Sequence, residues 1–169
     1  MHRSNLLVPD VVPQIAPAPR HRTKSRRLRA GDPAVRAMTD FWRDPPLTTS
    51  EDCDLDTAMD DMFRLGVRAF LVVRDFSVVG LVTAEDIREA RRSTATRVLE
   101  VMTAAEEMPA IDWQVLREAT IRDLLEIFEG AKVEHLVVLE NESAQRASVR
   151  GLVHRSRIEQ HLRVSTEPL

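Results

Sequence analysis

Two similar stretches of the sequence carry the side chains with the most evident chemistry. The first, GLVTAEDI, places the hydroxyl of Thr83 three residues before the carboxylate of Asp86. The second, GLVHRSRI, places His154 three residues before Arg157. A carboxylate only accepts hydrogen bonds and a guanidinium only donates them. The two stretches therefore cannot bind the same chemical group in the same way.

A structural role also fits these residues. Thr83 follows an apolar strand pattern and precedes a helical one, so its hydroxyl could cap the helix, and Asp86 would favour the helix dipole. His154 and Arg157 could equally lie on a solvated helix face or form a salt bridge to the acidic part of the chain. Helix capping and ligand contact both remain open for Thr83 and Asp86.

Both stretches belong to a longer internal repeat. The segment TIRDLLEIFEGAKVEHLVVLE aligns with DLDTAMDDMFRLGVRAFLVVR, so that Leu55 corresponds to Ile121 and Val72 to Val138 at a spacing of 66 residues. The segments VRAMT and LEVMT also correspond, at a spacing of 64. Independent matches in a fixed order indicate a true repeat.

The repeat predicts an α/β fold. Apolar residues recur at helical spacing from Leu55, and Gly66 ends that helix. The segment RAFLVV is too apolar for simple alternation, which predicts a strand buried on both faces. A second strand, SVVGLVT, and a second helix follow. Each repeat is thus helix–strand–strand–helix after a short lead-in, and two such small units would pack as a pseudo-two-fold pair to complete a core.

Charge and composition suggest the domain limits. Residues 1–31 are rich in proline and in Lys and Arg, and they lack apolar periodicity, so we expect a flexible basic tail. The first repeat should span 32–95 and the second 96–165, with 166–169 as the C-terminal end. Nucleic-acid binding through the tail is not favoured, because no aromatic residue lies among its basic residues and the rest of the chain is acidic.

These motifs resemble the cystathionine-β-synthase (CBS) domain family. The lead-ins AMTD and EVMT, the segments LGVRAFLVV and GAKVEHLVV and the closing GLVTAEDI carry the resemblance. The order occurs twice, so the chain resembles a tandem CBS pair, or Bateman module, of the kind found as small stand-alone bacterial proteins. The resemblance implies a regulatory, non-enzymatic module that binds AMP, ADP, ATP or S-adenosylmethionine.

The resemblance also implies a ligand site. It assigns the ribose hydroxyls to Asp86 and a phosphate or ribose contact to Thr83. The other implied ligand-binding residues are Gly80, for close backbone approach, Leu71 and Val72, for an adenine slot, and Thr48, at the lead-in. Arg157 and His154 could contact phosphate. The family often has proline in the first strand of each repeat, where this chain has Leu71 and Val137.

Other expectations follow from what the sequence lacks. Cys53 is the only cysteine, and the histidines lack metal-ligand spacing, so we expect no catalytic residue, no metal and no cofactor. We expect a cytoplasmic homodimer without membrane contact. Trp42 and Trp113 should lie in the core or at its rim. The expected dimer face contains Met59, Met62, Phe63, Leu125 and Phe128. The alternative function is a structural or interaction module whose ligand sites have decayed.

Overall fold

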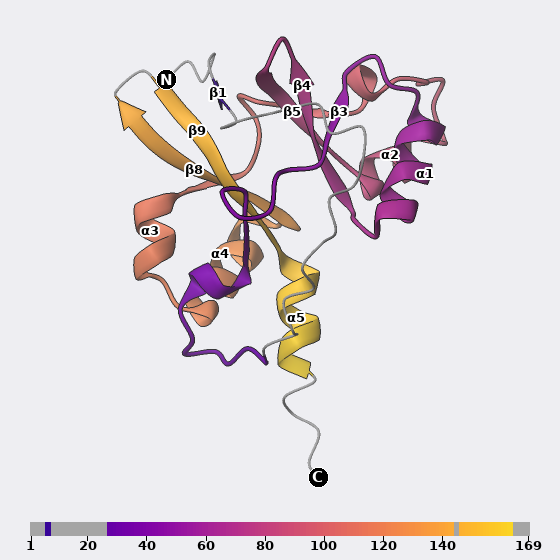
Figure 1. Cartoon of the computed structure of the whole chain (residues 1–169). Helices are drawn as coiled ribbons and strands as arrows, with labels where there is room; N and C mark the ends of the chain where they lie inside the picture. The colour runs from indigo at the N-terminus through magenta and orange to yellow at the C-terminus, as the bar shows by residue number, and fades with distance from the viewer. Residues whose placement is uncertain (1–5, 8–26, 144–145, 164–169) are drawn as a thin grey trace.

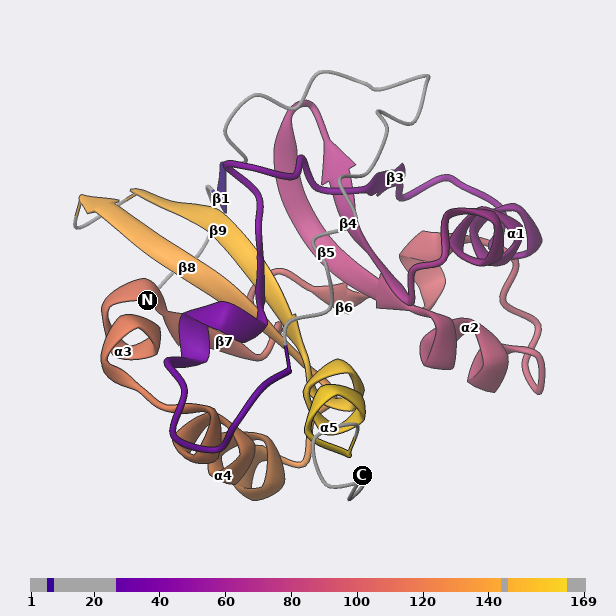
Figure 2. The same cartoon turned by 60° about the horizontal axis from the view of Figure 1, so that its bottom comes forward.

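The computed structural model describes residues 6–7, 27–143 and 146–163. Figure 1 and Figure 2 show two α/β halves whose strands face each other and whose helices lie outside. The first repeat contains η1 (Ala34–Ala37), β2 (Met38–Asp40), β3 (Thr48–Ser50), α1 (Leu55–Leu65), β4 (Ala69–Arg74), β5 (Ser77–Thr83) and α2 (Ala84–Ala90). The second contains η2 (Val98–Glu100), β6 (Thr103–Ala104), β7 (Ala110–Asp112), α3 (Trp113–Glu118), α4 (Ile121–Ala131), β8 (His135–Ser143), β9 (Arg146–His154) and α5 (Arg155–Arg163).

This architecture confirms the predicted α/β fold and its internal repeat. Helices α1 and α4 begin at the aligned residues Leu55 and Ile121. Each ends at a left-handed residue, Gly66 with φ 66° and Lys132 with φ 54°, which are also 66 positions apart. Helix α3 has no counterpart in the first repeat and was not predicted.

The core has three parts. One lies under α1 and α2 and includes Phe70 and Val72. Another lies under α3, α4 and α5 and includes Leu124 and Phe128. The third lies between the two halves and includes Leu71 from β4 and Val137 from β8. Strand β4 thus buries alternate side chains on opposite faces, as its unbroken apolar run predicted.

Each lead-in strand pairs with the other repeat. Strand β2 of the first repeat runs antiparallel to β9, with Thr39 opposite Leu152. Strand β6 of the second repeat runs antiparallel to β5, with Thr103 opposite Leu81. The short helices before these strands are exchanged in the same way. Ala34 of η1 lies in the core of the second repeat, and Val98 of η2 lies in the core of the first. The two repeats therefore hold each other reciprocally.

The exchange depends on the two GLV glycines. A Cβ atom on Gly80 would lie 2.6 Å from the backbone oxygen of Thr103, and one on Gly151 would lie 2.5 Å from that of Thr39. Real Cβ atoms do not approach so closely, so only glycine lets the lead-in strands pass. Both glycines follow a β-bulge, where the carbonyls of Val79 and Arg150 accept hydrogen bonds from the lead-in backbone at 2.9 and 3.0 Å.

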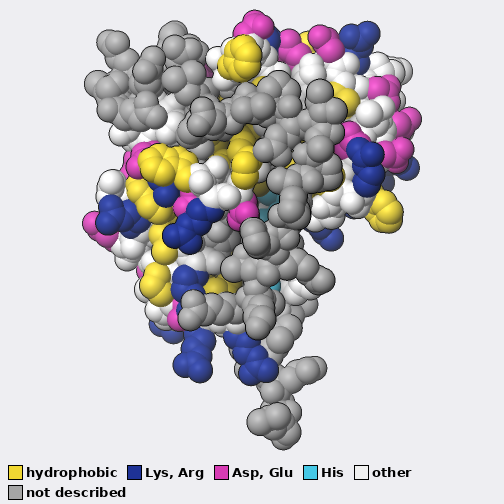
Figure 3. All heavy atoms as spheres, in the orientation of Figure 1, with side chains coloured by type: hydrophobic (Ala, Val, Ile, Leu, Met, Phe, Trp, Pro, Cys, Tyr) yellow, Lys and Arg dark blue, Asp and Glu magenta, His cyan; other side chains and the backbone are white. Residues whose placement is uncertain are grey.

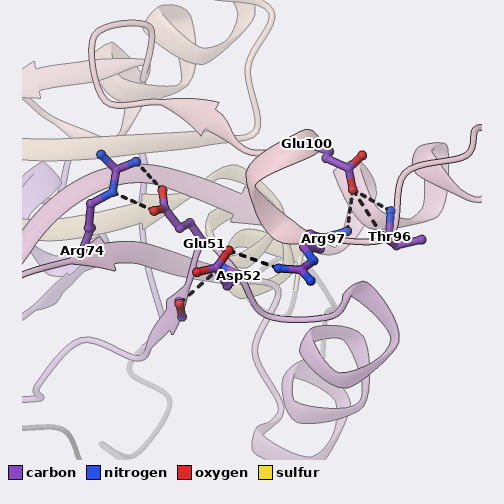
Figure 4. A network of polar contacts seen from close by, with 7 residues as sticks. Glu51, Asp52, Arg74, Thr96, Arg97 and Glu100 are labelled. Atoms are coloured by element: carbon purple, nitrogen blue, oxygen red, sulfur yellow. Dashed lines mark hydrogen bonds and ion pairs between the residues drawn. The ribbon is translucent and has the colours of Figure 1, made fainter.

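The linker between the repeats is fastened to the turn that precedes α1. The N–H of Leu55 donates to the carbonyl of Thr96 at 2.9 Å, and Arg97 lies 3.3 Å from the carboxylate of Asp52. Figure 4 shows this network together with the paired Glu51 and Arg74. Backbone N–H groups of residues 96 and 97 bind Glu100, which holds the pKa of that carboxyl below its usual value.

The predicted tail boundary at residue 32 is wrong for the part of 1–31 that the structure describes. Leu28 is only 4% exposed in the core of the second repeat, and the carbonyl of Ala30 accepts a hydrogen bond from Arg122 N–H at 2.9 Å. Strand β1 (Leu6–Leu7) pairs with both β5 and β9. Residues 1–5 and 8–26 lie outside the described residues. Packing on the core therefore begins before Asp32.

The burial of Leu28 gives a stability prediction. Leu28→Ala should lower the free energy of unfolding by about 2–5 kcal/mol, because it leaves a cavity in the core of the second repeat. Urea denaturation followed by circular dichroism measures the change. Leu99, which is 49% exposed, provides the control, and Leu99→Ala should lower stability far less. Equal losses in the two variants would show that Leu28 is not a core residue.

The glycine crossings give a second prediction. Gly80→Ala and Gly151→Ala should each destabilise the fold by about 1–3 kcal/mol or more, because the added methyl group overlaps a backbone oxygen. Gly130→Ala in α4 is the matched control, since a Cβ there meets nothing within 4 Å. That substitution should be stabilising by about 0.5–1 kcal/mol. Thermal unfolding of the three variants gives the comparison, and a neutral Gly80→Ala would contradict the required close approach.

Candidate functional site

Thr83 and Asp86 lie together where β5 meets α2. Thr83 is the N-cap residue of α2 in extended conformation. One carboxylate oxygen of Asp86, Oδ2, accepts hydrogen bonds from the backbone N–H and from the hydroxyl of Thr83, both at 2.7 Å. The N–H of Asp86 donates to Thr83 Oγ1 at 3.2 Å. The two residues form a capping box, so the structural role expected for them is present.

The same arrangement occurs away from this junction. Thr120 and Asp123 form an equivalent box at the start of α4, with the hydroxyl and the backbone N–H of Thr120 at 2.7 and 2.8 Å from Asp123 Oδ2. The N–H bond lowers the pKa of Asp123. Threonine followed three residues later by aspartate is thus sufficient for capping. In both boxes only Oδ2 of the aspartate accepts hydrogen bonds from the residues that the structure describes, but Asp86 is half-buried whereas Asp123 is exposed.

The other residues predicted for the first ligand site lie on the neighbouring strands β3, β4 and β5. Gly80 was expected to let a ligand approach the backbone closely, but the space beside it is filled by Met102 and Thr103. Leu71 and Val72 are 1% and 0% exposed and face different cores. Thr48 lies opposite Leu71 in the parallel β3–β4 pair and is half-buried. Gly80 and the two strand residues therefore already pack against protein.

The second motif brings together different chemistry. His154 ends β9, and its ring lies edge-to-face on that of His135 with the centroids 4.1 Å apart. His154 Nδ1 is 3.0 Å from the hydroxyl of Ser156. Arg157, in the first turn of α5, donates to the hydroxyl of Thr39 at 3.2 Å. Because Thr39 belongs to β2, this contact joins the two repeats.

Burial and nearby charges lower the pKa values of the His135 and His154 imidazoles. Burial, the charge of His154 and the charge of Arg68 lower the pKa of His135 to about 3. Burial, Arg68 and Arg157 also lower the pKa of His154. Arg68 and His135 were not predicted as site residues. The repeat spacing gave a signal for His135 only, because His135 corresponds to Ala69, the cross-strand partner of Thr83.

A second group of residues surrounds Arg150 on the same hairpin. Arg150, at the β9 bulge, stacks between Trp42 and Trp113, with its guanidinium carbon 3.8 and 4.7 Å from the two ring centroids. Its nitrogens lie 3.1 Å from Asp40 and 3.2 Å from Glu140. Trp42 is 60% exposed, which places it at the rim, whereas Trp113 is half-buried. This arrangement anchors the chain after β2 to the second repeat.

A cavity of about 260 Å³ lies between the start of α1 and the end of α2, beside Asp54, Ile87 and Arg91, and none of the predicted site residues lines it. Among the described residues, no group of three or more His, Cys, Asp or Glu side chains could hold a metal ion. No helix within that part of the chain has both the length and the apolar character needed to cross a membrane.

Comparisons with known proteins agree with this fold. A comparison with curated proteins gave no match. Many solved structures match, and three of them have TM-scores of 0.54–0.55. A putative signal-transduction protein with CBS domains from Burkholderia ambifaria MC40-6 has TM-score 0.54 and 22% identity over 73% of this chain and 87% of its own. The CBS domain pair of protein MJ0100, in complex with 5′-methylthioadenosine and S-adenosyl-L-methionine, has TM-score 0.55 and 15% identity over 75% and 96%. CBSX2, in complex with AMP, has TM-score 0.55 and 14% identity over 81% and 100%.

The family model matches a shorter part of the chain than the solved structures do. The CBS domain model matches residues 36–93, which cover most of the first repeat. The second repeat has the same order of strands and helices, apart from the added α3, and the solved structures extend the match over it. Residues 36–93 therefore belong to the CBS domain family, and the chain has the fold of a CBS-domain pair.

Proposed function

We propose that this protein is a non-enzymatic regulatory module that binds an adenosyl ligand at its first motif. The observation that carries the proposal is the position of Asp86. Its half-buried carboxylate lies at the β5–α2 junction, and only Oδ2 is used by the capping box within the described residues. Oδ1 stays available as an acceptor. A ribose diol offers two hydroxyl donors, which a carboxylate can accept.

The solved relatives support this ligand class. CBSX2 was solved with AMP, and the MJ0100 pair was solved with 5′-methylthioadenosine and S-adenosyl-L-methionine. These compounds share an adenosyl group and differ in charge beyond it. A ribose contact at Asp86 uses the shared part, so AMP, ADP, ATP and S-adenosylmethionine are all candidate ligands. Because Leu71 and Val72 are buried, an adenine ring at β4 would have to contact the strand backbone or displace side chains.

Asp86→Ala is the direct test. A ligand at 100 times its dissociation constant should stabilise the wild-type fold by ~2.7 kcal/mol, which a thermal shift detects. Asp86→Ala should lose that ligand-dependent shift and also lose about 1 kcal/mol of intrinsic stability, because it breaks the cap. The measurement is a thermal-shift titration with adenosine, AMP, ADP, ATP and S-adenosylmethionine, confirmed by calorimetry.

Asp123→Ala is the matched control. It removes the carboxylate of the same kind of capping box in α4 and should cost similar intrinsic stability. Its ligand-dependent shift should remain that of the wild type. If both variants keep the shift, Asp86 does not contact ligand. If no adenine compound binds at millimolar concentration, the regulatory proposal fails and the interaction module replaces it.

We also propose that the protein forms a homodimer through α1. The expected dimer face needs correction, because Met62 and Phe128 are 1% and 0% exposed and belong to the core. Met59 and Leu125 are partly buried. Phe63, on α1, is 89% exposed, more than any other large hydrophobic side chain among the described residues. Phe63 therefore remains as the candidate contact, and dimerisation also suits the interaction module.

Light scattering tests the dimer. The wild-type protein should have about twice the monomer mass of 19.2 kDa at micromolar concentration. Phe63→Glu should give the monomer mass, because it places a charge in the apolar contact. Phe76→Glu is the control, since Phe76 is also exposed (71%) but lies in the β4–β5 turn. A wild-type mass of 19.2 kDa would exclude the dimer.

A further inference from the structure

Two histidines lie together where the second repeat meets the first. His135 begins β8 opposite His154, which ends β9, and the two rings are edge to face with their centroids 4.1 Å apart. His154 directly follows Val153, which pairs with Met38 of strand β2 from the first repeat. We call His135 and His154 the imidazole pair. The pair therefore lies at the end of the ladder through which the lead-in strand of the first repeat holds the second.

The Nε2 atoms of the imidazole pair are buried, and neither has a hydrogen-bond partner in the described part of the chain. His154 Nδ1 does lie 3.0 Å from the hydroxyl of Ser156. A neutral imidazole can leave one nitrogen as an unused lone pair, whereas a charged imidazole carries an N–H on both nitrogens. Protonation would therefore bury a charged donor without an acceptor, which costs far more than an unused lone pair.

The charges around the imidazole pair also oppose protonation. Besides burial, which is the main cause, Arg68 lowers the pKa of both histidines, and Arg157 lowers that of His154. Arg68 directly precedes β4 of the first repeat, whereas Arg157 lies in the first turn of α5. Because the pair belongs to the second repeat, a proton on either ring repels the first repeat at Arg68.

No carboxylate is among the charges that act on the imidazole pair in the described residues. Glu134, directly before β8, and Glu159, on α5, act instead on the guanidinium of Arg155. Glu159 also forms an ion pair with Arg155 at 2.9 Å. A charged imidazole would therefore meet cations from both repeats and no charge of opposite sign.

We propose that the imidazole pair makes the contact between the two repeats sensitive to acid. While both rings are neutral, β2 and β9 can pair beside them. A protonated ring favours the state in which this contact is open, because there the ring is hydrated and lies farther from the two arginines. The proton thus acts as a ligand of the open state. This sensitivity requires no adenosyl ligand, so it stands or fails independently of the proposed function.

Urea denaturation of the full-length chain at about pH 7.5 and about pH 5.5 tests the proposal. The ordinary imidazole pKa of about 6.5 lies between these values, so both histidines become charged on unfolding only at the lower pH. On acidification the unfolding constant of the wild type should rise about 100-fold more than that of the double variant His135→Leu/His154→Leu. Each single variant should rise about tenfold less than the wild type.

His161→Gln is the matched control for these variants. It removes a histidine of α5 that lies outside the pair, and it should keep the wild-type rise. If the double variant rises as much as the wild type, the imidazole pair is not the acid-sensitive element.

Arg68→Gln tests the part played by the first repeat without altering the buried rings. Arg68 is exposed, so the variant should fold, as circular dichroism verifies. Without this charge the folded protein should take up protons on the pair more readily, and the rise in the unfolding constant should be smaller than in the wild type. Arg92→Gln is the control, since it removes an exposed charge that does not act on either imidazole. Equal rises in the Arg68 variant and the wild type would contradict repulsion from the first repeat.

Nuclear magnetic resonance locates the effect. In the folded protein at about pH 5.5, the C2 proton signals of His135 and His154, assigned from the single variants, should keep the positions of neutral imidazole. Hydrogen exchange, corrected for the direct effect of pH on exchange rates, should lose protection in β2 and at the end of β9 before α1 does. Ordinary titration of both signals near pH 6.5, or equal loss of protection in β2 and α1, would overturn the proposal.

Discussion

The structure depends on the passage of each lead-in strand across a glycine of the other repeat. At Gly80 and Gly151 the Cα atoms lie so close to the crossing backbone that no side chain fits. The crossings carry Val98 and Ala34 into the core of the opposite repeat. Neither repeat completes its own hydrophobic core, so the two small units must pack against each other to bury their apolar residues. The glycine of each GLV motif is thus explained by folding, without reference to a ligand.

The same constraint leaves the residues after each glycine free to differ. The strand-to-helix junctions lie at Thr83 and at His154, and Thr83 forms a capping box with Asp86 at the first. At the second, the residue that corresponds to Asp86 is Arg157, which has only donors and therefore cannot accept a hydrogen bond from the backbone N–H of His154; its side chain contacts Thr39 of the other repeat. The first junction therefore combines local stability with an available acceptor, whereas the second presents donors. This difference in chemistry is a property of the side chains alone, because the two backbones correspond.

The sequence predicted what is local and repeated, and it failed where contacts are distant. The starts at Leu55 and Ile121 and the stop at Gly66 follow from periodicity and capping, and all three were correct. Periodicity cannot tell which strand a two-residue strand such as β6 pairs with, since pairing across repeats is decided by packing. Leu28 was missed for the same reason, because an isolated leucine in a basic segment has no periodic neighbours. Arg68 and His135 come from different repeats, so only the fold brings them together.

Strand β2 connects the crossing to two arginines of the second repeat, Arg157 and Arg150. Thr39 accepts a hydrogen bond from Arg157, and the next residue, Asp40, binds Arg150 between the two tryptophans. The second of these contacts is nearly buried, with the Arg150 side chain only 12% exposed, and it fixes one end of the crossing. The first is exposed and joins Arg157 to a neutral hydroxyl, so it contributes little to the attachment of the strand. The Arg150 contacts therefore hold most firmly the strand through which the first repeat pairs with the second.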